Sequence, residues 1–128
     1  MLYTHLNHIE TTADYQRVIG ENDQVVIVCG RMGEFSIPVY RVLEDLQTAY
    51  PQMKFFDMEY DNPETKFVCN LFADIPEAKI PFLLFIENGE VVYRTWGTKT
   101  KEEIEEILPP NPLKGGQETT RFRDLNTY

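Results

Sequence analysis

The apolar residues of this chain fall into short blocks whose spacing alternates between strand-like and helix-like. The block 25–29, Val-Val-Ile-Val-Cys, is too short for a buried helix and is rich in β-branched residues, so we predict a strand covered on both faces. Beyond Gly33 the apolar spacing becomes helical, which predicts a helix that Pro51 ends. Its apolar positions are Val39, Val42, Leu43, Leu46 and Tyr50. A strand, a tight turn and a helix form the kind of corner where α/β proteins place their sites.

Two short elements are predicted before this corner. The run 6–9 is either a first edge strand or an ordered lead-in. Thr11 or Thr12 can cap a helix whose first turn contains Asp14, because a hydroxyl group accepts a hydrogen bond from an unpaired N–H group at a helix start. Gly20 is expected to end that helix.

The second half of the chain predicts two strands joined as a hairpin, preceded by a strand and a helix. Residues 53–60 are aromatic-rich and alternate in part, which favours a strand. Pro63 suits the first position of a helix, whose apolar face would contain Phe67, Val68, Leu71 and Phe72. The runs 81–86 and 91–96 flank Asn88-Gly89, a pair typical of tight hairpin turns.

A last helix and a tail complete the chain. Thr100 and Glu103 have the spacing of a capping box, which predicts a helix start; its inward positions are Ile104, Ile107 and Leu108. Three prolines follow closely, at 109, 110 and 112. We therefore expect one domain over 1–108, large enough at this size to bury a core, and a C-terminal tail over 109–128.

The net charge of the chain argues against two classes of binding partner. The 128 residues carry a formal net charge of −9, which would repel a phosphate backbone or an anionic membrane, so neither nucleic acid nor membrane is an expected partner. The longest apolar run, 80–86, is far short of the ~20 residues of a transmembrane helix, and the N-terminus lacks a signal-peptide pattern. Two cysteines do not make a disulfide framework and suit a reducing compartment. We therefore expect a cytoplasmic protein.

The final third of the chain contains, in order, Ile80-Pro81, the apolar run 82–86, the segment Asn88-Gly89-Glu90-Val91, Gly97 and the closing helix. This series resembles the C-terminal half of thioredoxin. The resemblance extends over roughly 9–108, with Pro38 similar to the proline inside the second helix of thioredoxin. It implies an α/β fold: a central mixed sheet of about four to five strands, helices on both faces, and a cis peptide bond before Pro81.

The chain departs from thioredoxin at the active site, where the family carries Trp-Cys-Gly-Pro-Cys. Counting back from Pro38 places Gly30 and Gly33 at the two cysteine positions and Cys29 at the tryptophan. With one residue inserted in the turn, Cys29 takes the first cysteine position and Met32 the second. With a shorter turn, Cys29 stays inside the strand. The second cysteine is missing in all three registers.

Two hypotheses for Cys29 follow. At a helix N-terminus beside Arg31 its thiolate would be favoured, and an external thiol such as glutathione could resolve its mixed disulfide, which gives a monothiol redox site. Alternatively, Cys29 is a small buried hydrophobe at the end of a core strand. Cys69 is expected to be buried and inert, outside disulfide distance of Cys29. The protein is then no conventional dithiol-disulfide oxidoreductase.

A binding role is the alternative to a redox role. In the thioredoxin family, backbone groups before the cis proline pair with an extended stretch of a client protein. We call the corresponding residues here the client surface; they are Gly30, Arg31, Met32, Gly33, Ile80 and Pro81. The expected partner is a protein or peptide client, with glutathione as a further candidate.

Other chemistry has less support in the sequence. His5 and His8 have no second Cys or His pair at metal-ligand spacing, so we expect no metal site, and no motif indicates a cofactor. The residue equivalent to the buried acid of thioredoxin is Asp23 in one register and Gln24 in another. The acidic run Glu102, Glu103, Glu105 and Glu106 is interpreted as the solvent face of the last helix.

Overall fold

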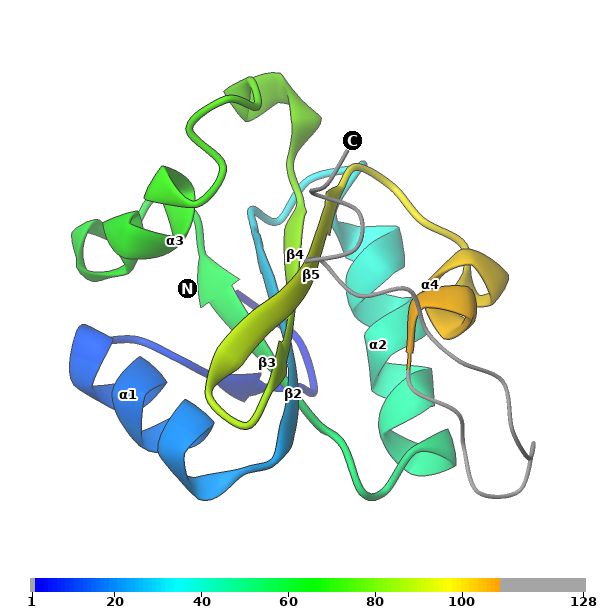
Figure 1. Ribbon diagram of the computed structural model, residues 1–128. Helices are drawn as coiled ribbons and strands as arrows, with labels where there is room; N and C mark the ends of the chain where they lie inside the picture. The colour runs from blue at the N-terminus through cyan, green and yellow to red at the C-terminus, as the bar shows by residue number, and fades with distance from the viewer. Residues whose placement is uncertain (1, 109–128) are drawn as a thin grey trace, which may run out of the picture.

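The apolar strand predicted at 25–29 lies at the centre of a mixed five-stranded sheet in the computed structural model, which describes residues 2–108 (Figure 1). The predicted tail, 109–128, lies outside the described residues. In chain order the elements are β1 (Asn7–His8), α1 (Thr12–Glu21), β2 (Gln24–Gly30), α2 (Ile37–Ala49), β3 (Lys54–Glu59), a 3₁₀ turn (Pro63–Thr65), α3 (Lys66–Asn70), a second 3₁₀ turn (Glu77–Lys79), β4 (Phe82–Glu87), β5 (Glu90–Trp96) and α4 (Lys101–Ile107).

The sheet joins a parallel half to an antiparallel half at β2. The strand order is β1-β3-β2-β4-β5. Strands β1, β3 and β2 run parallel, whereas β4 pairs antiparallel with both β2 and β5. Strand β2 is therefore hydrogen-bonded on both sides, and this explains its burial from Val25 to Gly30.

Each face of the sheet packs against two helices, with α1 and α3 on one side and α2 and α4 on the other (Figure 1). The two cores follow the alternation of β2. Val26 and Val28 pack with Leu43 of α2 and Ile104 of α4. On the other face the core contains Val25, Ile27, Cys29, Val18 of α1 and Val68 of α3. Cys29 therefore points toward the α1 and α3 side of the sheet, because alternate side chains of a strand face opposite ways.

The local signals at chain turns form as predicted. Thr11, and not Thr12, caps α1 in a reciprocal pair with Asp14, and Thr100 with Glu103 makes the same capping box at α4. The hairpin between β4 and β5 turns through Asn88 and Gly89, whose φ angles of 50° and 82° are left-handed. The peptide bond between Ile80 and Pro81 is cis.

Three details of the helices differ from the sequence-based expectation. Helix α1 continues past Gly20 to Glu21. The third helix is divided into a 3₁₀ turn and the short α3, since the Thr65 hydroxyl donates to the carbonyls of Glu59 and Asn62 and tightens the first turn. Pro38 stands in the first turn of α2, where its missing N–H group has no helical acceptor to lose.

Candidate functional site

The turn after β2 is held in one conformation by polar contacts to α2. The N–H groups of Ser36 and Ile37 donate to the Gly33 carbonyl at 3.1 and 2.9 Å, and the Tyr40 hydroxyl donates to the Arg31 carbonyl at 2.9 Å. We call residues 31–36 the β2 loop. Tyr40 is 1% exposed. Because its hydroxyl is held in the core of the protein, its hydrogen bond fixes the position of the loop backbone at Arg31.

Gly30, the last residue of β2 and the one before the β2 loop, lies against the cis proline. A Cβ atom added to Gly30 would lie 2.7 Å from Tyr40 Oη, 2.8 Å from Ser36 Oγ and 3.2 Å from Pro81 Cβ. Only glycine allows this approach, since real Cβ atoms do not make contacts under 3.0 Å. The end of β2 and Ile80-Pro81 therefore form one continuous surface.

The residues of the client surface differ in their exposure. Gly30 and Pro81 are buried and form its floor, while Arg31, Gly33 and Ile80 are half-buried. Met32 is 37% exposed. Phe35, also in the β2 loop, was not predicted from the sequence as a site residue. It is 61% exposed, and its carbonyl accepts a hydrogen bond from the Thr98 hydroxyl. Two large apolar side chains thus stand on the loop beside the cis proline.

Cys29 lies below this surface and not on it. Its side chain is 0% exposed, between Met58 of β3 and Phe82 of β4 in the sheet register. The interaction with the Cys69 thiol, and then burial, raise the pKa of Cys29 well above its ordinary value. Of the two hypotheses for Cys29, its burial and raised pKa favour the small buried hydrophobe over the monothiol site.

Arg31 does not act on Cys29, because its charge is bound elsewhere. The guanidinium donates to both carboxylate oxygens of Asp61, at 2.7 and 2.8 Å, and to Glu77 at 3.3 Å. It also covers the Tyr60 ring, with 5.0 Å between Cζ and the ring centroid. Arg31 therefore joins the β2 loop to the segments around α3.

Cys69 is partly exposed and has a lowered pKa, as the monothiol hypothesis required of Cys29. It is half-buried and lines a cavity of about 400 Å³ together with Tyr60, Asp61, Asn62, Lys66, Asn70 and Glu77. Hydrogen bonding with the Cys29 thiol, opposed by partial burial and assisted by Lys66, lowers the pKa of Cys69 to about 7. The expectation of a buried Cys69 is wrong, because α3 leaves that residue partly exposed to solvent.

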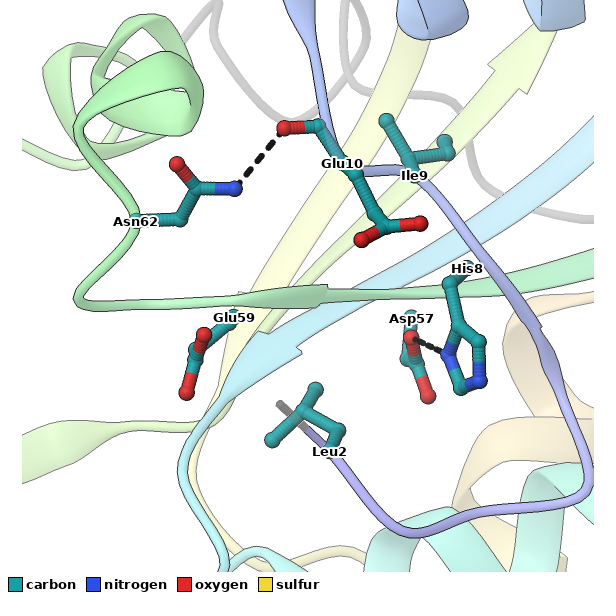
Figure 2. Close-up of a pocket in the computed structure, with 7 residues that line it drawn as sticks. All are labelled: Leu2, His8, Ile9, Glu10, Asp57, Glu59 and Asn62. Carbon is teal, nitrogen blue, oxygen red and sulfur yellow. Dashed lines mark hydrogen bonds and ion pairs between the residues drawn. The ribbon is translucent and has the colours of Figure 1, made fainter.

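A second cavity, of about 110 Å³, lies beside β1 and β3 and is lined by Leu2, His8, Ile9, Glu10, Asp57, Glu59 and Asn62 (Figure 2). Asp57 is 1% exposed; its carboxylate accepts from the Thr4 hydroxyl and lies 2.6 Å from His8 Nδ1. Burial raises the pKa of Asp57, and the contacts with Thr4 and His8 oppose that rise. Asp57 is a buried acid, whereas Asp23 is exposed and Gln24 half-buried.

The histidines have protein partners. His8 Nδ1 contacts the Asp57 carboxylate, and the backbone N–H group of His5 donates to Glu44 at 2.6 Å. Over residues 2–108 there is no group of three or more His, Cys, Asp or Glu side chains that could hold a metal ion. No helix of that same range is long and apolar enough to cross a membrane.

The described elements define the class of the protein: an α/β domain with a central mixed sheet, helices on both faces and a cis proline opposite a strand-to-helix corner. Solved structures with this fold are thioredoxins and their relatives. Mitochondrial thioredoxin 3 of Saccharomyces cerevisiae has a TM-score of 0.65 at 17% identity, covering 79% of this chain and 91% of that one. Thioredoxin NaTrxh of Nicotiana alata has a TM-score of 0.65 at 18% identity, covering 83% and 91%.

A third similar structure comes from a study of thiol resolution in yeast mitochondrial 1-Cys peroxiredoxin via the glutathione and thioredoxin systems. Its TM-score is 0.68 at 19% identity, covering 83% of this chain and 95% of that one. No protein-family model and no curated protein sequence matches the chain. The protein therefore has the thioredoxin fold, as the sequence resemblance indicated, without the CxxC pair of thioredoxin.

Proposed function

We propose that this protein is a cytoplasmic thioredoxin-fold protein of thiol redox homeostasis that binds a protein client in extended form at the client surface. The observation that carries the proposal is the packing of Gly30 against Pro81, which sets the exposed β2 loop beside the cis proline. Exposed apolar side chains beside a rigid backbone segment are typical of sites for extended peptides.

The client surface would bind chiefly through apolar contacts. The Ile80 N–H group already donates to the Glu77 carbonyl at 3.1 Å, so it is less available for pairing with a client backbone. Met32 and Phe35 are then the main anchors, because large apolar side chains contribute most of the energy of such interfaces. The Met32 sulfur also accepts from the Tyr3 N–H group at 3.3 Å, which restricts its position.

A monothiol role for Cys29, with glutathione as the resolving thiol, has less support. A nucleophilic thiol has to meet its substrate as a thiolate, and Cys29 is buried with a raised pKa. Client binding does not require this group to be exposed.

The test is a titration of the labelled protein with a reduced, S-alkylated polypeptide, which stays unfolded and has no thiol. We expect amide NMR shifts confined to the β2 loop and to Ile80. Phe35→Ser should weaken binding at least about fivefold, the loss expected for an anchor worth more than 1 kcal/mol. Leu71→Ser is the matched control, because Leu71 is 43% exposed on the α3 side of the molecule. Absence of shifts at the β2 loop, or equal effects of the two variants, would refute the proposal.

A further inference from the structure

Two cysteines that are far apart in sequence approach each other in the fold. Cys29 is near the end of β2, and its neighbour in β4 is Phe82. Phe72, which follows α3, stacks on that same Phe82 ring with 4.4 Å between centroids and 4° between planes. Val68 packs in the same core as Cys29. These contacts place α3 over Cys29. The Tyr60 N–H group donates to the Gly30 carbonyl at 2.9 Å, and Tyr60 and Cys69 line the same cavity, so Cys69 lies near the end of β2 that carries Cys29.

The segment leading into α3 is anchored at several points. The Thr65 hydroxyl donates to the Glu59 carbonyl at 2.9 Å, and the Asn62 amide donates to the Glu10 carbonyl at 2.8 Å. The Thr12 hydroxyl donates to the Glu64 carbonyl at 3.0 Å. Because these bonds connect α3 to β3 and to the start of α1, the approach of Cys69 to Cys29 is part of the packed structure.

The two thiols differ in access to solvent. Cys29 is completely covered, whereas Cys69 opens into the cavity of about 400 Å³. That volume is within the range of small-molecule sites, and the wall of the cavity carries both signs of charge, from Lys66, Asp61 and Glu77. An incoming disulfide can therefore meet Cys69 but not Cys29.

We propose that Cys29 and Cys69 are a dithiol site that exchanges with an accessible disulfide and closes to an intramolecular Cys29–Cys69 disulfide. The proposal deepens the proposed function and rests on its redox part, not on client binding. The site lies beside the client surface, since Arg31 of that surface binds Asp61 and Glu77 in the cavity wall.

The exchange has two steps. The Cys69 thiolate attacks one sulfur of the substrate disulfide, a Cys69–substrate S–S bond forms, and the other half of the substrate leaves as a thiolate that takes up a proton. Cys29 then loses its proton and attacks Cys69 Sγ, which releases the remaining half as a second thiol. The protein loses two protons and two electrons in total, and the substrate disulfide is reduced to two thiols.

The roles follow from the environments of the two groups. The thiolate fraction of Cys69 at neutral pH is raised because its pKa is lowered to about 7, first by the Cys29 S–H. Cys29 remains protonated until the mixed disulfide has formed, which suits a resolving group. Closing the bond requires the two sulfur atoms to approach to about 2.0 Å.

The experiment exposes the full chain at low concentration to oxidised glutathione or, separately, to a disulfide-linked synthetic peptide, followed by acid quenching, alkylation and peptide mapping. We expect wild-type protein to lose two hydrogens and to yield the linked Cys29 and Cys69 peptides. Cys29→Ala should accumulate the Cys69 mixed disulfide at least about tenfold above wild type, because the resolving thiol is gone. Cys69→Ser should remain unmodified in the native state. The faster of the two oxidants identifies the source of the disulfide.

Three outcomes would overturn the dithiol site. They are a stable Cys69 mixed disulfide in wild type with Cys29 still free, a disulfide between Cys69 residues of two molecules, and no reaction of either cysteine in the folded protein. Circular dichroism of Cys29→Ala, together with Cys29→Ser as a second replacement, separates lost resolution from lost folding. The peptide titration with an S-alkylated probe reports on client binding alone, so failure of the thiol pair is distinguishable from failure of the client surface.

Discussion

The β2 loop and α3 meet across the Arg31 side chain, yet they offer different chemistry. The β2 loop follows the strand-to-helix corner and carries exposed apolar groups, Met32 and Phe35. The adjacent α3 carries the titratable thiol, Cys69, in a charged cavity. On the two proposals above, client binding and thiol chemistry therefore occupy neighbouring elements, and the corner geometry does not require the reactive sulfur to lie on it.

The sharpest test of this comparison is native-state alkylation of the two cysteines with peptide mapping. We expect Cys69 to react in the folded protein and Cys29 to react only after opening, which costs several kcal/mol in a core strand and should slow Cys29 more than about a hundredfold. The Cys69 rate should rise with pH as the thiolate forms, with a midpoint of about 7, below the ~8.5 of a free thiol. Comparable native rates for Cys29 and Cys69 would reverse the assignment of their roles.

The next test breaks the β2 loop and leaves α3 in place. Gly30→Ala would force its Cβ into the buried Tyr40 hydroxyl and Ser36 Oγ, and such overpacking typically costs about 1–3 kcal/mol. We expect a melting temperature lower by roughly 4–8 °C per kcal/mol, and weaker binding of the unfolded probe because the loop moves away from Pro81.

Gly33→Ala is the matched control for that substitution. No atom lies within 4 Å of a Cβ added there, and the φ angles of Gly30 and Gly33 are both outside the left-handed region. We expect a change within about 0.5 kcal/mol or a gain of about 0.4–1 kcal/mol from reduced freedom of the unfolded chain. Equal destabilisation by both variants would show that close packing at Gly30 does not set the loop.

The sequence predicted the sheet better than it predicted the site, and particular residues show why. The hairpin around Asn88-Gly89 and the capping boxes at Thr11 and Thr100 are local signals, readable because neighbouring residues complete them. The Cys29–Cys69 pair depends on the position of α3 over β2, which the stacking of Phe72 on Phe82 determines. No spacing within the chain encodes that contact.

Asp57 is a second residue whose environment could not be predicted from the sequence. Within the strand its polarity gave no sign of burial, because the residues that satisfy it, Thr4 and His8, come from the N-terminal segment. The β2 corner itself was predicted correctly as strand, turn and helix. The face of the sheet to which Cys29 points was not predicted. Alternation along β2 shows only that successive side chains face opposite ways; it does not show which of the two faces packs against α3.

The smallest expected effect concerns the charges around Cys69, and it has opposite signs for two substitutions. Lys66 lowers the pKa of Cys69 and Asp61 raises it. Lys66→Gln should therefore reduce the thiolate fraction and slow alkylation at pH 7 by about twofold, the size expected for exposed charges worth less than 1 kcal/mol. Asp61→Asn should accelerate it by a similar factor, because it also frees part of the Arg31 charge that Asp61 binds. Both differences should shrink in 1 M salt, where the screening length is about 3 Å. Two results would contradict this expectation: both substitutions changing the rate in the same direction, or salt leaving the differences intact. Either result would show that a shift of α3, and not the charges of Lys66 and Asp61, controls the reactivity of Cys69.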